Sequence, residues 1–176
     1  AKYNDDIYVT GNLGDSFVGL RILQNIIKTN NKLKNYFIKK YFEPEIQIKL
    51  AKELLKFARS SIDISDGLID DLKKMINKQN LSYKIFEEKI PISKNLFNYL
   101  KKNDLKKYNF ISNGDDYQIL FTAGADKSRI IKNISKKLGI KISKIGKIGS
   151  SNEKSTIVNQ KGQHLLVKNQ GYKHQF

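Results

Sequence analysis

The most informative stretch for the fold is SIDISDGL, residues 61–68, in which a predicted strand leads directly into a predicted helix. Side chains of a strand point to opposite faces in turn, so Ile62 and Ile64 share one face and Asp63 lies on the other. Beyond this strand, apolar residues recur with helical spacing and predict a helix over residues 68–76. Carboxylates and hydroxyls are therefore concentrated at one strand-to-helix junction.

Strands and helices extend outward from this junction in both directions. The predicted strands cover residues 7–10, 61–65, 81–85, 117–122, 140–148 with a break at Gly146, 156–158 and 165–167. One predicted helix begins at Asp15. The other predicted helices cover residues 36–41, 46–57, 68–76, 95–100 and 127–138. Because these elements do not follow strict βαβ order, the pattern favours an α+β fold over a doubly wound sheet.

Length and composition limit the class of protein. The chain has 176 residues, 39% of them hydrophobic, and no Pro- or Ser-rich linker divides it, so one domain over residues 1–176 is expected. It has no cysteine and two histidines, which excludes disulfides, thiolate zinc sites and cysteine nucleophiles. No apolar run approaches the roughly 20 residues that span a bilayer, and the first residues do not resemble a signal peptide. We therefore expect a cytoplasmic protein without a membrane partner.

The charge balance is strongly basic, with 33 Lys and Arg against 17 Asp and Glu and a net charge of +16. Such a balance is typical of nucleic-acid-binding proteins. Only three of the basic residues are arginines, however, and the lysines are scattered over predicted polar helix faces. We interpret the charge as a solvated surface and expect no nucleic-acid partner. A non-catalytic basic module that binds a polyanion is kept as the alternative.

The junction at residues 61–68 is the best candidate for chemistry. Asp63 lies between two isoleucines, where a carboxylate is costly to bury without a cation, and Asp66 can turn to the same side. Two hard oxygen donors suit Mg²⁺, which takes its other ligands from water and substrate phosphates. The alternative is that Ser65 or Asp66 only caps the following helix, which would leave Asp63 unexplained.

Two glycine-containing turns also have both a functional and a structural interpretation. Residues 11–20 form a strand-to-helix turn that matches neither the dinucleotide nor the phosphate-loop pattern, so we expect Asp15 to be a helix N-cap and Gly19 a close-packing residue. Residues 113–117 place Asp115 and Asp116 after an Asn-Gly turn, where acids are usually solvated. The other interpretation is that one acid reaches a cationic group of a ligand.

Taken together, these motifs resemble the carboxy-terminal half of the thiamine-monophosphate kinases, within the aminoimidazole ribonucleotide synthetase-like superfamily. The segments that carry the resemblance occur in the family's order over nearly the whole chain. They are VTGNLGD at 9–15, DISDGL at 63–68 with Asp71-Leu72, IPIS at 90–93, GDDYQILF at 114–121 and GYKH at 171–174. The DISDGL segment alone is shared with aminoimidazole ribonucleotide synthetase and selenophosphate synthetase, which remain alternatives.

The resemblance implies a fold, a reaction and site residues. The fold is a layered α/β/α domain with a mixed, mostly antiparallel sheet. The reaction transfers the γ-phosphoryl group of ATP directly to thiamine monophosphate with the help of Mg²⁺. Carried over by position, Asp63 and Asp66 are Mg²⁺ ligands and Ser65 contacts ATP. Asp115, where the family usually has Glu, and Tyr172 contact the thiamine phosphate, and no residue of the chain is assigned as catalytic.

The sequence departs from the family in two respects. Gln175 separates His174 from Phe176, whereas the family motif has His directly followed by Phe. The family enzyme also begins with another domain, which supplies most Mg²⁺ ligands, several ATP contacts and the interface of a homodimer. The resemblance therefore implies that residues 1–176 are the carboxy-terminal domain of a longer kinase and are inactive alone.

Asp116 is expected to support the site without touching a ligand.

Overall fold

The structure, a computed structural model, describes residues 1–166. Its strands are β1 (Asp6–Thr10), β2 (Ala58–Asp63), β3 (Leu81–Phe86), β4 (Ile119–Ala123), β5 (Ile142–Ser150) and β6 (Thr156–Val158). Its helices are α1 (Asp15–Leu23), α2 (Asn31–Phe42), α3 (Ile48–Leu54), α4 (Leu68–Met75), α5 (Lys94–Lys102), α6 (Tyr108–Ile111) and α7 (Ser128–Leu138). Two short 3₁₀ turns, η1 (Glu87–Lys89) and η2 (Ala125–Lys127), follow β3 and β4.

All six strands form one sheet in the order β2-β4-β1-β5-β3-β6. Each neighbouring pair is antiparallel except β3 and β6, which are parallel. The mixed, mostly antiparallel sheet and the α+β class are therefore confirmed. β5 pairs with β1 near its start and with β3 over its second half, so it joins the two parts of the sheet.

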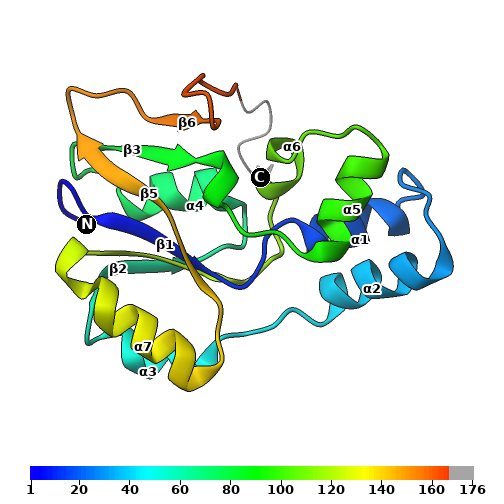
Figure 1. Ribbon diagram of the computed structural model, residues 1–176, viewed down its shortest axis with the longest axis horizontal. Coiled ribbons are helices and arrows are strands. Elements are labelled where there is room, and N and C mark those ends of the chain that lie inside the picture. The colour runs from blue at the N-terminus through cyan, green and yellow to red at the C-terminus, as the bar shows by residue number, and fades with distance from the viewer. Residues whose placement is uncertain (167–176) are drawn as a thin grey trace.

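Helices cover both faces of the sheet, and the central strand shows why. Every residue of β1 is buried. Ile7 and Val9 belong to the core shared with α4, whereas Tyr8 stacks on Phe121 in the core shared with α3 and α7. The resulting α/β/α layering is visible in Figure 1, where α3 and α7 lie below the sheet. Helices α1, α2, α5 and α6 gather to its right around a third core that includes Phe37.

One edge of the sheet collects the loops of interest. Strands β1, β2, β3 and β6 end there and β4 and β5 begin there, as their antiparallel registers require. The loops after β2 and before β4 lie at one end of this edge, because β2 and β4 are neighbours. The loops after β3 and β6 lie at the other end.

The structure differs from the predicted elements in a few places. β5 is one continuous strand through Gly146; its pairing with β1 shifts register there, as in a β-bulge, instead of breaking. Residues 117 and 118 precede β4, because Tyr117 has a left-handed backbone with φ 50°. α2 begins at Asn31, capped by the Asn30 side chain, and α6 was not predicted. Leu165 forms a backbone bond to Ile157 without a strand, and Val167 lies outside the described residues.

Among residues 1–166, no helix combines the length and apolar character needed to cross a membrane.

Candidate functional site

The acidic junction predicted from the sequence lies where β2 ends. Asp63 is the last residue of the strand and is exposed, whereas Ile64 is fully buried. Ser65 and Asp66 follow in a loop and are half-buried. Gly67 takes the N-cap position of α4 with no side-chain cap, so neither Ser65 nor Asp66 caps the helix and the capping interpretation was wrong.

A second loop, residues 113–118, pairs with this junction. The amide of Asp115 donates to the carbonyl of Ser65 at 3.0 Å, and the amide of Tyr117 donates to the carbonyl of Ile64 at 2.8 Å. The amide of Ile64 donates in return to the carbonyl of Gln118 at 2.8 Å. We call residues 64–67 and 113–118 the paired loops. Their hydrogen bonds bring Asp115 beside the predicted ATP and metal residues, although about fifty positions separate them in the chain.

Two glycines allow the backbones of this region to approach each other. A Cβ atom at Gly114 would lie 2.0 Å from the carbonyl oxygen of Ser65. At Gly67 it would lie 2.4 Å from the carbonyl oxygen of Ser112, and the backbone there has φ +133°. Both contacts are with backbone atoms, which cannot rotate away as a side chain can. Only glycine therefore permits the observed spacing.

Replacing Gly114 with alanine is expected to lower the free energy of unfolding by about 2–3 kcal/mol, because the loops must separate or strain to admit a methyl group. The adjacent substitution Asn113→Ala removes a side-chain bond to the Asn109 carbonyl at 2.9 Å and a long one to the Phe110 carbonyl at 3.5 Å, and should cost about 1 kcal/mol or less. Urea unfolding followed by circular dichroism measures both. Equal losses in the two variants would contradict the steric account.

A buried acid that was given no role from the sequence fixes the first loop. One side-chain oxygen of Asp71, on α4, accepts hydrogen bonds from the amides of Ser65, Asp66 and Gly67, each at 3.0 Å. Its other oxygen accepts from the ammonium group of Lys74 at 2.8 Å. Asp71 is 1% exposed. The signal in the sequence was an acid on the otherwise apolar stripe of α4.

Negative charge accumulates across the paired loops. Burial raises the pKa of Asp115, and the nearby carboxylate of Asp66 raises it further. Burial also raises the pKa of Tyr117, followed by the charges of Asp115 and Asp63. Lys74 forms an ion pair with Asp66, and its bonds to Asp66 and Asp71 raise its pKa. An ammonium group thus neutralises part of the charge that several carboxylates create.

The acids of this region supply some of the ligands that a Mg²⁺ ion requires. Carboxylates are among the donors that Mg²⁺ prefers, and Asp63 and Asp66 belong to one short segment. The charge of Asp66 adds to the burial that raises the pKa of Asp115. Within residues 1–166, however, no three His, Cys, Asp or Glu side chains are grouped closely enough to hold a metal alone. The residues fit a Mg²⁺ that completes its shell from water, phosphate oxygens or other protein ligands. They do not form a complete cage.

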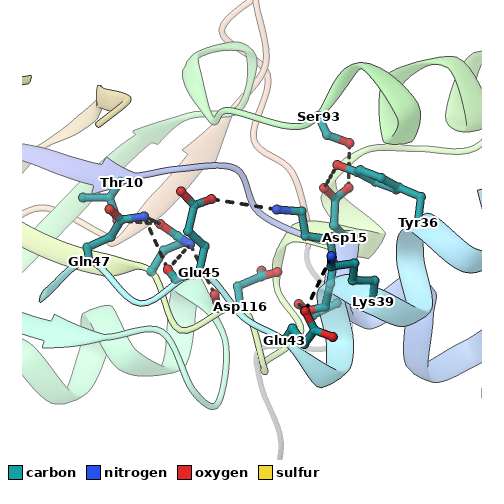
Figure 2. A network of polar contacts seen from close by, with 12 residues as sticks. Thr10, Asp15, Tyr36, Lys39, Glu43, Glu45, Gln47, Ser93 and Asp116 are labelled. Atoms are coloured by element: carbon teal, nitrogen blue, oxygen red, sulfur yellow. Dashed lines mark hydrogen bonds and ion pairs between the residues drawn. The ribbon is translucent and has the colours of Figure 1, made fainter. Parts of the chain in front are cut away.

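A second polar network lies beside the site, under the turn between β1 and α1. Asp15 accepts from the hydroxyl groups of Tyr36 at 2.8 Å and Ser93 at 2.7 Å, as Figure 2 shows. Gly14, with φ 88°, is the N-cap of α1, so the N-cap role predicted for Asp15 was wrong. Gly19 packs as predicted, since a Cβ there would lie 2.3 Å from the Phe37 carbonyl.

Asp116 belongs to this network and is 4% exposed, so the solvated interpretation of this acid was wrong. One of its oxygens accepts from the amide of Gly14 at 2.8 Å. Burial raises the pKa of Asp116 to about 8, and the charge of Asp15 adds to the effect. Asp116 therefore anchors the loop of Asp115 to the start of α1 without facing the acidic junction.

The raised pKa makes stability depend on pH. Between about pH 4 and pH 8 the folded state retains a proton on Asp116 that the unfolded state releases, so this contribution is present at low pH and is lost as the pH rises toward 8. Relative to Asp116→Asn, the free energy of unfolding should fall by up to about 1.4 kcal/mol per pH unit across this window. Urea unfolding of both proteins from pH 5 to pH 8 measures the difference. The exposed Asp126→Asn is the control, and a constant difference for Asp116→Asn would contradict the assignment.

The predicted site residues are thus partly brought together. Asp63, Ser65, Asp66 and Asp115 lie on one strand end and the paired loops. Tyr172 lies outside the described residues.

The chain is similar in sequence to thiamine-monophosphate kinases. The chain is 36% identical over 175 residues to the thiamine-monophosphate kinase of Buchnera aphidicola subsp. Schizaphis graminum, and 31% identical over 175 residues to that of Escherichia coli K12. These matches cover 99% of the chain but 54% and 53% of the relatives. The chain therefore spans about half the length of these curated relatives.

Solved structures give the same result. The thiamine-monophosphate kinase of Stenotrophomonas maltophilia K279a aligns with a TM-score of 0.75 and 27% identity, covering 94% of this chain and 52% of that one. A structure of AaThiL complexed with AMPPCP and TMP aligns with a TM-score of 0.78 and 26% identity, covering 99% and 52%. The family "AIR synthase related protein, C-terminal domain" matches residues 2–159, and the chain belongs to this family.

Proposed function

We propose that the chain is the carboxy-terminal part of a thiamine-monophosphate kinase, which transfers the γ-phosphoryl group of ATP to thiamine monophosphate. The observation that carries the proposal is the pairing of the two loops, in which the Asp115 amide bonds to the Ser65 carbonyl at 3.0 Å. This pairing holds the loop of Asp115 against the loop of Ser65 and Asp66. The similarity to thiamine-monophosphate kinases over 99% of the chain supports the choice of substrate.

In the proposed reaction a phosphate oxygen of thiamine monophosphate forms a bond to the γ-phosphorus of ATP while the bond from that phosphorus to the β,γ-bridging oxygen breaks. The products are thiamine diphosphate and ADP, without a phosphoenzyme. Mg²⁺, when bound, neutralises the charge on the phosphates. Asp63 and Asp66 hold it, Ser65 contacts ATP, and Asp115 and Tyr172 contact thiamine monophosphate.

The roles of these side chains are mainly positional. Phosphoryl transfer gains most of its rate from alignment of the reacting groups and from neutralised charge. The three amides bound to Asp71 fix the backbone of the first loop, and the Asp116 bond to Gly14 anchors the second. The two loops can therefore hold their binding side chains in place without a change of backbone conformation.

The activity is proposed for the whole protein. Because this chain spans about half of its curated relatives, we propose that a preceding domain supplies further Mg²⁺ and ATP ligands and the interface of a homodimer. The incomplete metal shell of Asp63 and Asp66 agrees with this division. Residues 1–176 alone are expected to be inactive.

The test is an assay of the full-length protein with ATP, thiamine monophosphate and Mg²⁺, followed by chromatography of thiamine diphosphate and ADP. Equal amounts of the two products, no product in EDTA and no product from residues 1–176 alone would support the proposal. ATP consumption without thiamine diphosphate would overturn it in favour of another member of the superfamily. Turnover by the isolated chain would overturn the division of the site.

A further inference from the structure

A cavity in the described part of the chain lies away from the acidic junction. It has a volume of about 700 Å³ and lies at the other end of the same sheet edge, between the loop after β3, the start of β5 and the turn after β6. None of Asp63, Asp66 and Asp115 lines it. Its volume lies within the range of small-molecule sites in proteins.

Positive charge is concentrated on the wall of this cavity. Four lysines line it, Lys89, Lys107, Lys141 and Lys161, against the two acids Glu87 and Glu88. Within residues 1–166, no carboxylate forms an ion pair with Lys107 or Lys141. The ammonium groups are therefore only partly compensated.

Two of these lysines are held in place by neutral acceptors. Lys107 donates to the backbone carbonyl of Glu87 at 2.6 Å, and Lys141 donates to the side-chain oxygen of Asn12 at 2.7 Å. An ammonium group has three hydrogen atoms to donate, so each retains donors for a ligand. Burial lowers the pKa of both lysines. At Lys107 the charges of Glu87 and Glu88 oppose this shift in part, and the charge of Lys141 adds to it. Bringing two such cations together costs free energy that a bound anion would recover.

Part of the remaining wall is apolar. Ile90, Pro91 and Ile92 line it, and Phe97 contributes a ring that is 55% exposed. Large exposed aromatic rings beside a cavity can pack against an organic ligand. The wall thus combines an anion-binding part and a part suited to a flat or apolar group.

We propose that this cavity binds a phosphorylated organic molecule of about nucleotide size, whose phosphate contacts Lys107 and Lys141 and whose organic part packs on Phe97 and the Ile90–Ile92 segment. The site is separate from the one at the paired loops, and it does not depend on the proposed kinase reaction. It also requires no metal, because lysines neutralise the phosphate.

The probe is AMP, added to residues 1–176 in EDTA so that any Mg²⁺-dependent site at the aspartates is silent. We expect saturable binding by isothermal titration calorimetry with a Kd below about 1 mM. In NMR spectra, the amide chemical-shift changes should be confined to residues around the cavity, such as Ile92 and Ser143. Adenosine, which lacks the phosphate, should bind at least about tenfold more weakly. Equal binding of AMP and adenosine would overturn the phosphate assignment.

Substitutions separate this site from the general basic surface. Lys107→Gln and Lys141→Gln should each weaken AMP binding about tenfold, Lys107→Arg should retain it, and Lys101→Gln, on the exposed face of α5, should leave it unchanged. Asp63→Asn should also leave it unchanged, so failure here is distinguishable from failure of the proposed function. An equal loss with Lys101→Gln, or no saturation, would show attraction to lysines in general and overturn the proposal. Circular dichroism checks that each variant is folded. If Lys107→Gln does not fold, Lys141→Gln provides the test in its place.

Discussion

Replacing Asp71 with alanine is expected to lower the free energy of unfolding by about 3–5 kcal/mol. Asp71 is buried and accepts three backbone amides and the ammonium group of Lys74. Alanine removes the buried carboxylate, and the three backbone amides that donate to it lose their acceptor. Urea unfolding of residues 1–176, followed by circular dichroism, measures the loss.

The neighbouring residue provides a matched control. Asp70 lies on the same turn of α4, but its carboxylate is partly exposed and lies 3.9 Å from the ammonium group of Lys73. Asp70→Ala should therefore change stability by about 1 kcal/mol or less. Lys74→Met should also cost about 1 kcal/mol or less, because the ammonium group is half-exposed. A loss as large as that of Asp71→Ala in either control would show that the three amide bonds are not the main contribution.

Replacing Asp63 with asparagine in the full-length protein is expected to reduce kcat for thiamine diphosphate formation at least about 100-fold. Asparagine keeps the shape of the side chain but removes the charge proposed to hold Mg²⁺. Because Asp63 is exposed, the free energy of unfolding should change by about 0.5 kcal/mol or less. A steady-state assay over a range of Mg²⁺ concentrations should show that the variant needs more Mg²⁺ for half-maximal rate.

The control for this substitution is Asp126→Asn. Asp126 is also an exposed acid, but it follows β4 at the opposite edge of the sheet. It should retain the wild-type rate and the wild-type Mg²⁺ requirement. A fully active Asp63→Asn protein would remove Asp63 from the proposed metal site.

The sequence was most informative where a pattern is local. The predicted strands 7–10 and 81–85 match β1 and β3 to within a residue, and the predicted helices 68–76 and 127–138 match α4 and α7 equally well. It was least informative where packing overrides propensity. Tyr117 and Gln118 belong to a β-rich run, yet their backbone pairs with Ile64 in a turn because the second loop must meet the first. The four-residue α6 is too short to show a period.

The same distinction applies to the site. Asp63, Asp66 and Asp115 were identifiable because they stand in motifs. The burial of Asp15 was not, because its partner Ser93 lies 78 residues away along the chain. The burial of Asp116 likewise depends on its contact with Gly14, 102 residues away. Such roles depend on which segments the fold brings together.

The reciprocal backbone bonds between the paired loops have a consequence for dynamics. Asp115 and Tyr117 both have left-handed backbones, with φ 67° and 50°, which the loop would not retain without its partner. Opening either loop must break the bonds of both, so the two are expected to exchange their amide hydrogens as one cooperative unit. Ser65, Asp66 and Asp115 are then expected to be assembled or dispersed together.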